Sequence, residues 1–95
     1  MNKYEIALVL SSKADEEARN KILERVTKRV EKFGGTVNNI DDQGKKRLAY
    51  EIQKMNEGFY YFIDVDCPPE APASIEKHLR IMDPVIRFLI VKQDA

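Results

Sequence analysis

The sequence predicts an α+β domain in which two helices alternate with four strands in the order β-α-β-β-α-β. Three observations predict it. Both ends of the chain alternate like strands, two inner segments repeat apolar residues at helical spacing, and two strand-like segments follow each other in the middle. A chain of 95 residues is long enough for one domain, residues 1–95, and too short for two.

The first third of the chain predicts a strand and then a helix. Residues 3–10 alternate between two apolar-rich rows, which indicates a central strand. The serine pair ending at Ser12 offers a helix cap, with Asp15 three places later in a capping-box arrangement. The helix runs to about Phe33, its last turns are basic, as suits the helix dipole, and Gly34 begins the glycine pair that ends it. Its buried stripe is expected to contain Ala18, Ile22, Leu23, Val26, Val30 and Phe33.

The rest of the chain completes the pattern. A long irregular strand is expected, with a bulge at Gly44, and an aromatic and β-branched strand follows after a turn. The two prolines after Cys67 end that strand, and Pro84 ends a short second helix. The expected bounds are 36–52 for the second strand, 54–58 for the turn, 59–65 for the third strand, about 70–82 for the second helix and 85–91 for the last strand.

This order of elements is that of the ferredoxin-like fold, a four-stranded antiparallel sheet with both helices on one face. With Ile6, Leu8 and Leu10 as the core row of the first strand, other large apolar side chains must face away from the helices. We expect these to be Phe59, Tyr61, Leu89 and Val91. Such residues are either ordinary surface side chains or a contact face for another macromolecule.

Charge and composition exclude several classes of protein. Sixteen basic residues balance sixteen acidic ones, so positive charge for a nucleic-acid partner has to be local. A single cysteine cannot form an internal disulfide, which argues against a secreted domain stapled by disulfides. No apolar run approaches the roughly 20 residues that span a bilayer, and the first residues lack the pattern of a signal peptide. We expect a cytoplasmic protein with no membrane partner.

The sequence offers little catalytic material. His78 is the only histidine and Cys67 the only cysteine, and they form no recognisable pair of nucleophile and base. The acidic residues Asp64, Asp66 and Glu70 do not have the spacing of a calcium loop. We therefore expect a binding protein with no enzymatic activity, catalytic residue, metal, cofactor or small-molecule substrate.

One alternative is an RNA-recognition motif, whose third strand carries alternating aromatic residues. Residues 57–62, EGFYYF, partly resemble that family's central signature, in which a basic residue and a glycine precede the aromatic residues. Glu57 stands where the basic residue is expected, and Asp64 stands where another aromatic residue is expected. In this alternative, single-stranded RNA would stack on Phe59 and Tyr61.

The segment GKKRLAYEI, residues 44–52, carries three consecutive cations into a strand. By itself it is a charged strand edge of the kind that blocks sheet-to-sheet pairing. It also resembles the signature of the bacterial small-subunit ribosomal protein S6 family, in which Gly, a basic residue, Leu, Ala or Ser, Tyr and Ile recur at these positions. The resemblance extends to residues 3–5, 79–83 and 91–92, in the same order as the expected elements.

The resemblance implies the ferredoxin-like fold and a role as a structural constituent of the 30S subunit. Members of the family bind 16S ribosomal RNA in the central domain of the small subunit, the platform, as a heterodimer with ribosomal protein S18. Such a partner would supply much of the charge that a neutral chain lacks, and an occupant for the uncovered face or its edge. The implied mode is recognition of RNA shape and backbone rather than of base sequence.

Candidate site residues follow from these expectations. Arg87 interrupts an apolar strand and carries a planar fork suited to phosphate. Arg80 lies near the end of the second helix, where it can equally serve the helix dipole. The candidate RNA contacts are Lys3, Arg80, Arg87 and Lys92. The candidate partner interface consists of Arg47 and Tyr50, assigned on the resemblance, and of Phe59, Tyr61, Leu89 and Val91 from the uncovered face.

Overall fold

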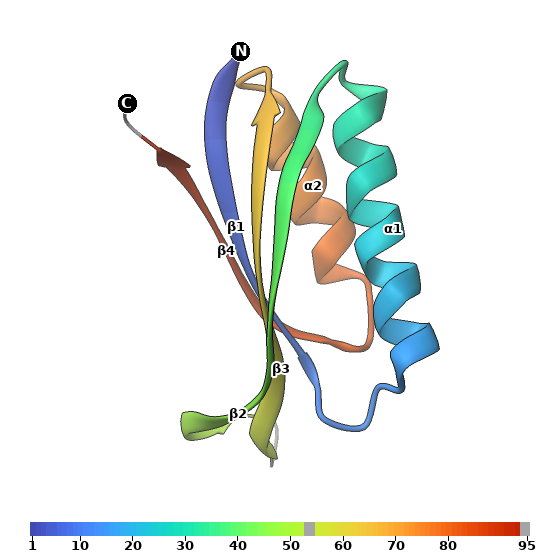
Figure 1. The fold of residues 1–95 in the computed structure, drawn as a ribbon, viewed down its shortest axis with the longest axis vertical. Coiled ribbons are helices and arrows are strands. Elements are labelled where there is room, and N and C mark those ends of the chain that lie inside the picture. Colours follow the sequence, from blue (N-terminus) through green and yellow to red (C-terminus); the bar gives the residue numbers. More distant parts are fainter. Residues whose placement is uncertain (53–54, 94–95) are drawn as a thin grey trace.

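Four strands and two helices follow one another in the predicted order (Figure 1). The computed structural model describes the backbone of residues 1–52 and 55–93 and, within these ranges, the side chains outside 48–56. The elements are β1 (Asn2–Ser11), α1 (Glu16–Lys32), β2 (Thr36–Ile52), β3 (Met55–Cys67), α2 (Ala71–Arg80) and β4 (Val85–Gln93).

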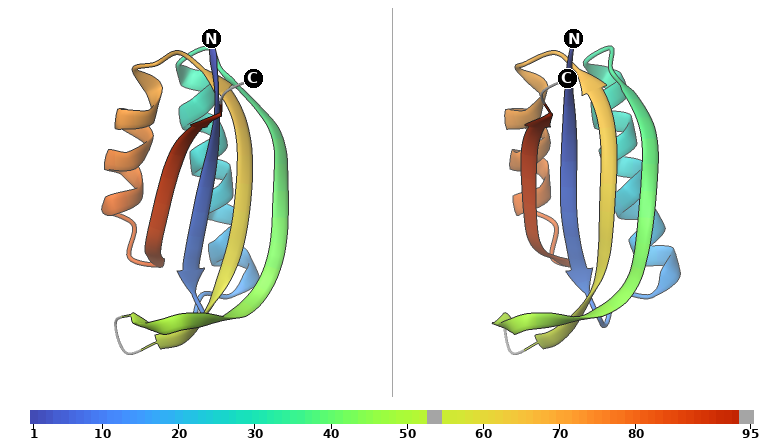
Figure 2. Two further views of the ribbon diagram at one scale, coloured as in Figure 1. Left: turned by 90° about the vertical axis from the view of Figure 1, so that its left-hand side faces the viewer. Right: turned by 60° about the vertical axis from the view of Figure 1, so that its left-hand side comes forward.

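The strands form one antiparallel sheet in the order β2-β3-β1-β4. Strands β1 and β3 are therefore central, and β2 and β4 are the edges. Both helices lie on the same side of the sheet, and the other side carries no helix (Figure 2). This arrangement confirms the ferredoxin-like α+β fold predicted from the sequence.

The core lies between the sheet and the two helices. Ile6, Leu8 and Leu10 of β1 are almost completely buried, as the alternation of that strand predicts. The other elements add Tyr61, Ile63, Val65 and Cys67 from β3, Ile22, Val26 and Val30 from α1, and Ala71, Ile75 and Leu79 from α2. Burying one such aliphatic side chain stabilises the fold by about 1.5–3 kcal/mol. These rows therefore decide which side of each element points inward.

The N-cap of α1 lies three residues after Ser12, the second residue of the predicted serine cap. Asp15 is the N-cap, and its Oδ1 accepts a hydrogen bond from the Ala18 N–H at 2.8 Å. Ser11 belongs to β1 instead, where its N–H donates to the Pro84 carbonyl at 2.7 Å. At the other end Gly34 adopts a positive φ of 79° and closes the helix, as predicted.

The β2–β3 hairpin differs from the prediction in its turn. Strand β3 already begins at Met55, so residues 55–58, for which the sequence predicts a turn, belong to the strand. Residues 53–54 lie outside the described part of the chain. Residues 55–58 belong to the strand because backbone pairing with β2 continues through Gly58 and Glu57 and overrides their turn propensity. The predicted bulge at Gly44 is confirmed by its positive φ of 74° and by a register shift just before it.

Candidate functional site

The side of the sheet without helices, here called the open face, carries a band of apolar side chains. Leu89 and Val91 of β4 are 57% and 47% exposed, and they lie opposite Ala7 and Glu5 of β1. Ala7 lies opposite Phe62 of β3 on its other side. The predicted outward orientation of Leu89 and Val91 is thus confirmed, and apolar residues continue from β4 across β1 to β3.

The predicted outward orientation of Phe59 and Tyr61 is wrong. Tyr61 lies opposite Leu8, and Phe59 lies opposite Leu10, in a row of β1 that points toward the helices. Tyr61 is only 3% exposed and belongs to the core, and Phe59 packs against it. Both rings therefore lie on the helix side of the sheet.

The alternation of β3 gives the reason. The row of Tyr61 continues with aliphatic residues, whereas the alternate row, Tyr60 and Phe62, continues with Asp64 and Asp66. Turning the second row inward would bury two carboxylates in the core, which costs several kilocalories per mole unless each is paired. The two aspartates were therefore the sequence feature that could have identified the outward row, and the aromatic residues of the open face are Tyr60 and Phe62.

Arg19 on α1 supplies the hydrogen-bond partner of the buried Tyr61 hydroxyl. Its Nε donates to the Tyr61 hydroxyl at 3.1 Å, and its Nη1 donates to the Ala14 carbonyl at 2.6 Å. Its guanidinium carbon lies 3.8 Å from the centroid of the Phe59 ring, which is a cation–π contact. In the RNA-recognition-motif alternative, Phe59 and Tyr61 were expected to stack on RNA bases. Neither ring lies on the open face, so this expectation is not met.

Carboxylates occupy one end of the open face. Asp64 lies opposite Glu5, and Asp66 lies opposite Lys3. Among the residues that the structure describes, Oδ1 of each aspartate is buried without a hydrogen-bond partner. Because an unpaired buried oxygen costs about 1–3 kcal/mol, a donor from another molecule would be favourable at each position.

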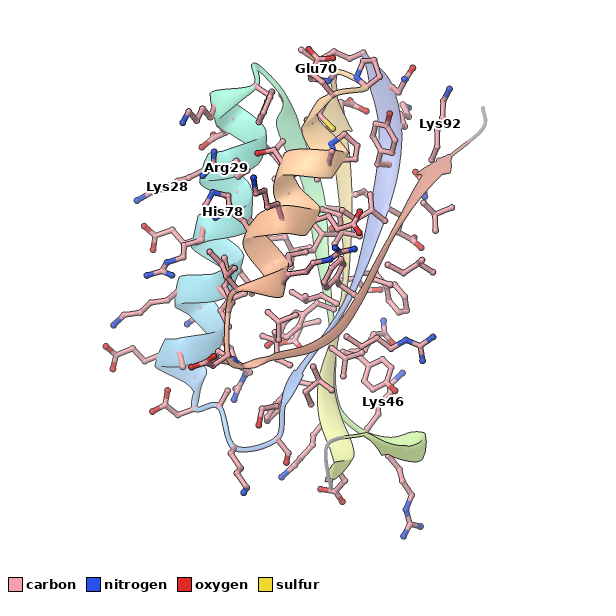
Figure 3. The ribbon with its side chains drawn as sticks, turned by 180° about the vertical axis from the view of Figure 1, so that it is seen from behind. Lys28, Arg29, Lys46, Glu70, His78 and Lys92 are labelled. Atoms are coloured by element: carbon pink, nitrogen blue, oxygen red, sulfur yellow. The ribbon has the colours of Figure 1, made fainter. Side chains whose placement is uncertain are left out.

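The four predicted RNA-binding cations do not form one cluster. Lys3 and Lys92 lie near one another because β1 pairs with β4, where Lys3 is opposite Gln93 and Lys92 is opposite Tyr4. Figure 3 shows Lys92 at the end of β4. Arg87 is five residues earlier on the same strand, about 17 Å away at the usual rise of a strand.

Arg80 lies in the helical layer, at the last residue of α2. Its Nη2 forms an ion pair with Glu76 one turn earlier, and 68% of its side chain is exposed. Such an exposed pair contributes little to stability. Arg80 is therefore accessible to another charged group, but it stands apart from Lys3 and Lys92.

Arg47 lies on the part of the β2–β3 hairpin that extends past the end of β1 (Figure 2). It is exposed and lies opposite Glu57, which forms an ion pair with Lys45 at 3.7 Å. The side chain of Tyr50, also predicted for the partner interface, lies outside the described residues. The hairpin thus presents charged side chains beyond the region that the helices cover.

Cys67 is completely buried at the end of β3. Burial raises the pKa of its thiol, and the carboxylates of Asp66 and Glu70 add to the rise. A thiol held in its protonated form is a poor nucleophile. Among residues 1–47 and 57–93, whose side chains the structure describes, no three His, Cys, Asp or Glu side chains come together as a metal site.

Within the described part of the chain, neither helix combines the length and the apolar character that crossing a membrane requires.

His78 lies half-buried on α2. Burial lowers the pKa of its imidazole, and Arg29, Lys32 and Arg25 lower it further because like charges oppose protonation. These three cations all lie on α1. They were not predicted as site residues. The helix dipole alone explains Arg29 and Lys32 in the last turn of α1, and the sequence assigns no role to Arg25.

A ferredoxin-like sandwich with an open apolar face, carboxylates at one end of that face and exposed cations on several elements defines a small domain that binds other macromolecules. The fold alone does not say which ones. Residues 3–92 match the family described as Ribosomal protein S6. The chain belongs to this family.

Individual relatives agree with the family match. The chain is 42% identical to the small ribosomal subunit protein bS6 of Clostridium beijerinckii over 95 residues, covering 100% of both chains. It is 40% identical to that of Alkaliphilus oremlandii over 92 residues, covering 97% of each. The crystal structure of 30S ribosomal protein S6 from Thermotoga maritima has a TM-score of 0.90 at 29% identity, covering 97% of this chain and 87% of that one.

Membership of this family makes the chain a structural protein of the small ribosomal subunit and not an enzyme. It is associated with ribosomal RNA through its place in that subunit. The resemblance seen in residues 44–52 therefore indicated the correct family.

Proposed function

We propose that the chain binds 16S ribosomal RNA in the central domain of the small subunit, as a heterodimer with ribosomal protein S18, in the cytoplasm. Residues 1–95 act as one domain in this role. The observation that carries the proposal is the open face, on which Leu89 and Val91 are exposed in a member of a ribosomal family. A protein partner that covers this face would bury apolar area worth about 25 cal/mol per Å².

The carboxylates of the open face support a partner that brings positive charge. Oδ1 of Asp64 and Oδ1 of Asp66 lack hydrogen-bond donors among the described residues. An ionised carboxylate only accepts hydrogen bonds, and its bonds to cationic donors are the strong ones. A basic partner would satisfy both aspartates and would also add positive charge to a chain whose own charges balance.

The proposed partner interface differs from the sequence prediction at two positions. Phe59 and Tyr61 leave it because they lie on the helix side of the sheet. Tyr60 and Phe62, the aromatic residues of the open face, replace them. The proposed interface consists of Arg47, Tyr50, Tyr60, Phe62, Leu89 and Val91.

The proposed RNA contacts are Lys3, Arg80, Arg87 and Lys92. Because these cations lie on different elements, they would contact separate phosphate groups along a folded RNA. Contacts of this kind fix the orientation of a protein on the RNA and carry no direct information on base sequence. Recognition would therefore depend on the shape of the RNA and on the partner bound beside it.

A band-shift experiment with a 16S fragment that contains the central domain tests the proposal. We expect tight binding when S18 is present and weak binding when the chain is alone. Short single-stranded oligonucleotides should bind poorly under both conditions, because Phe59 and Tyr61, the two rings expected to stack on bases, lie on the helix side of the sheet. Tight binding of such oligonucleotides by the isolated chain would overturn the proposal.

Leu89→Lys tests the open face itself. The substitution places a charge in the proposed apolar contact and should weaken the binding of S18 about tenfold, or ~1.4 kcal/mol. Stability should change by less than about 0.5 kcal/mol because the residue is exposed. Ala73→Lys on the exposed surface of α2 adds the same charge elsewhere and should leave binding unchanged. Equal affinities of the two variants in isothermal titration calorimetry would exclude the open face as the docking site.

A further inference from the structure

A groove of about 400 Å³ runs between α1 and α2, on the opposite side of the sheet from the open face. Figure 3 shows Lys28, Arg29 and His78 at the same level of the two helices. The groove is separate from the proposed RNA contacts, none of which lines it. Its lining residues are Arg25, Lys28, Arg29, Lys32, His78, Ile81 and Met82.

The α1 wall of the groove is a row of four cations. Arg25, Lys28, Arg29 and Lys32 recur at intervals of three and four residues, which places them on one side of the helix. The row spans two turns, about 10 Å along the helix axis. The cations are thus arranged along a line and do not converge on one point, which suits a chain of phosphate groups better than a single free anion.

Little negative charge opposes this row. None of the residues that line the groove is a carboxylate. Lys28 forms an ion pair with Glu24 at 2.9 Å, but the two side chains are 71% and 62% exposed, so water screens the pair. On α2, Glu76 is already paired with Arg80. The lowered pKa of His78 agrees with a positive field inside the groove.

The α2 side of the groove ends in an apolar surface. Ile81 is 74% exposed just after the last turn of α2, and the half-buried Met82 follows it. Apolar side chains next to a row of cations fit a ligand that combines phosphate groups with less polar sugar and base surfaces.

We propose that the groove between α1 and α2 binds the sugar–phosphate backbone of RNA, with the four cations on the phosphates and with Ile81 and Met82 against the sugars. The choice of RNA over another polyanion rests on the proposed function, because ribosomal RNA is the polyanion that this function brings to the chain. The chain would then contact RNA on its helical side and its protein partner on its open face.

His78 is the only histidine of the chain and provides a reporter inside the groove. Its imidazole is titrated by NMR in the intact protein, alone and with a short RNA duplex or inorganic phosphate. Bound phosphates offset the charge of Arg29, Lys32 and Arg25, so the duplex should raise the pKa of His78 above its value in the free protein. An unchanged pKa with the duplex would overturn the proposal. If inorganic phosphate at a matched phosphate concentration raised the pKa of His78 equally, the groove would be a site for free anions and not for RNA.

The double substitution Arg29→Gln and Lys32→Gln tests the same groove in the complex with S18 and the 16S fragment. We expect at least tenfold weaker binding than for the native chain and a salt dependence lower by about two units, roughly one for each phosphate that the variant no longer binds. The control Lys13→Gln with Lys21→Gln removes two exposed cations elsewhere and should bind as the native chain does. Circular dichroism checks that both variants are folded.

The outcomes separate this inference from the proposed function. If the native chain forms the complex and the groove variant binds as tightly as the control, the groove is not an RNA site and the proposed function stands. If the native chain forms no complex, the proposed function fails, and the titration of His78 with the duplex alone decides the inference.

Discussion

Arg19 shows how one side chain can satisfy a polar atom in the core. Its guanidinium donates to the Tyr61 hydroxyl and to the Ala14 carbonyl and lies over the Phe59 ring. A tyrosine in the core needs a partner for its hydroxyl, and Arg19 provides one from the adjacent helix. The sequence could not reveal this contact, because the two residues are far apart in the chain and only the packing of α1 on β3 brings them together.

Tyr61→Phe tests this contact. The substitution keeps the ring but removes the acceptor for Arg19, so the free energy of unfolding should fall by about 1–2 kcal/mol. Tyr61→Ala also leaves a cavity and should cost about 3–5 kcal/mol. Urea denaturation measures both values. If both variants were as stable as the native chain, Tyr61 would not lie in the core.

Gly35→Ala and Gly44→Ala should differ because only one site is crowded. A Cβ at Gly35 would overlap the Asp66 carbonyl and lie 2.9 Å from Cys67 Cβ and Val30 Cγ1, so we expect a loss of about 2–3 kcal/mol. At Gly44 nothing lies within 4 Å, and only the positive φ of 74° opposes the substitution, at a cost of about 1 kcal/mol. Thermal and urea denaturation of the pair give the comparison. The same loss at both sites would contradict the close approach of the helix end to β3.

At the scale of the elements, the sequence predicts all six in the right order, because their apolar periodicity is strong. It fails where a choice depends on a neighbouring strand. The inward row of β3 follows from its pairing with β1, and the start of β3 at Met55 follows from its pairing with β2. The two β3 rows resemble each other only in their aromatic part. The inner row then continues with aliphatic residues, whereas the outer row continues with Asp64 and Asp66.

The position at which α1 starts also differs from the sequence prediction, and a pair of substitutions tests which residue caps the helix. Asp15→Ala removes the side-chain cap that accepts from the Ala18 N–H and should destabilise the protein by about 1 kcal/mol. Ser12→Ala changes the residue that the sequence favours as the cap and should cost much less. Chemical denaturation of the two variants decides between the positions. A larger loss at Ser12 than at Asp15 would move the helix start back to the serine pair.

At the scale of the whole molecule, the sequence predicts part of the site. It correctly places Leu89 and Val91 outside the core, since Arg87 in the same row marks the outer side of β4. It gives no warning of the groove between α1 and α2, which exists only when α2 brings His78 beside the cations of α1. The spacing of those cations along one side of α1 was nevertheless visible in the sequence.

The lowered pKa of His78 predicts a dependence of stability on pH. Because the unfolded chain binds this proton more readily than the folded chain, protonation favours unfolding. The effect is absent above the ordinary pKa of about 6.5, and it grows as the pH falls from there toward the lower pKa of the folded state. The native chain should therefore lose stability relative to His78→Gln as the pH decreases from about 7.5 to about 5.5. Melting temperatures measured across this range check the expectation. A constant difference between the two proteins at all pH values would contradict it.

The unequal lengths of the strands have a consequence for local stability. Pairing between β1 and β3 ends at Ser11 and Gly58, whereas Arg47 and Glu57 pair beyond that point. There the sheet is reduced to two strands, and an isolated pair of strands is marginally stable in water. Opening this end of the hairpin should require less free energy than unfolding the core. A binding partner could therefore reshape the hairpin while the rest of the domain keeps its native packing.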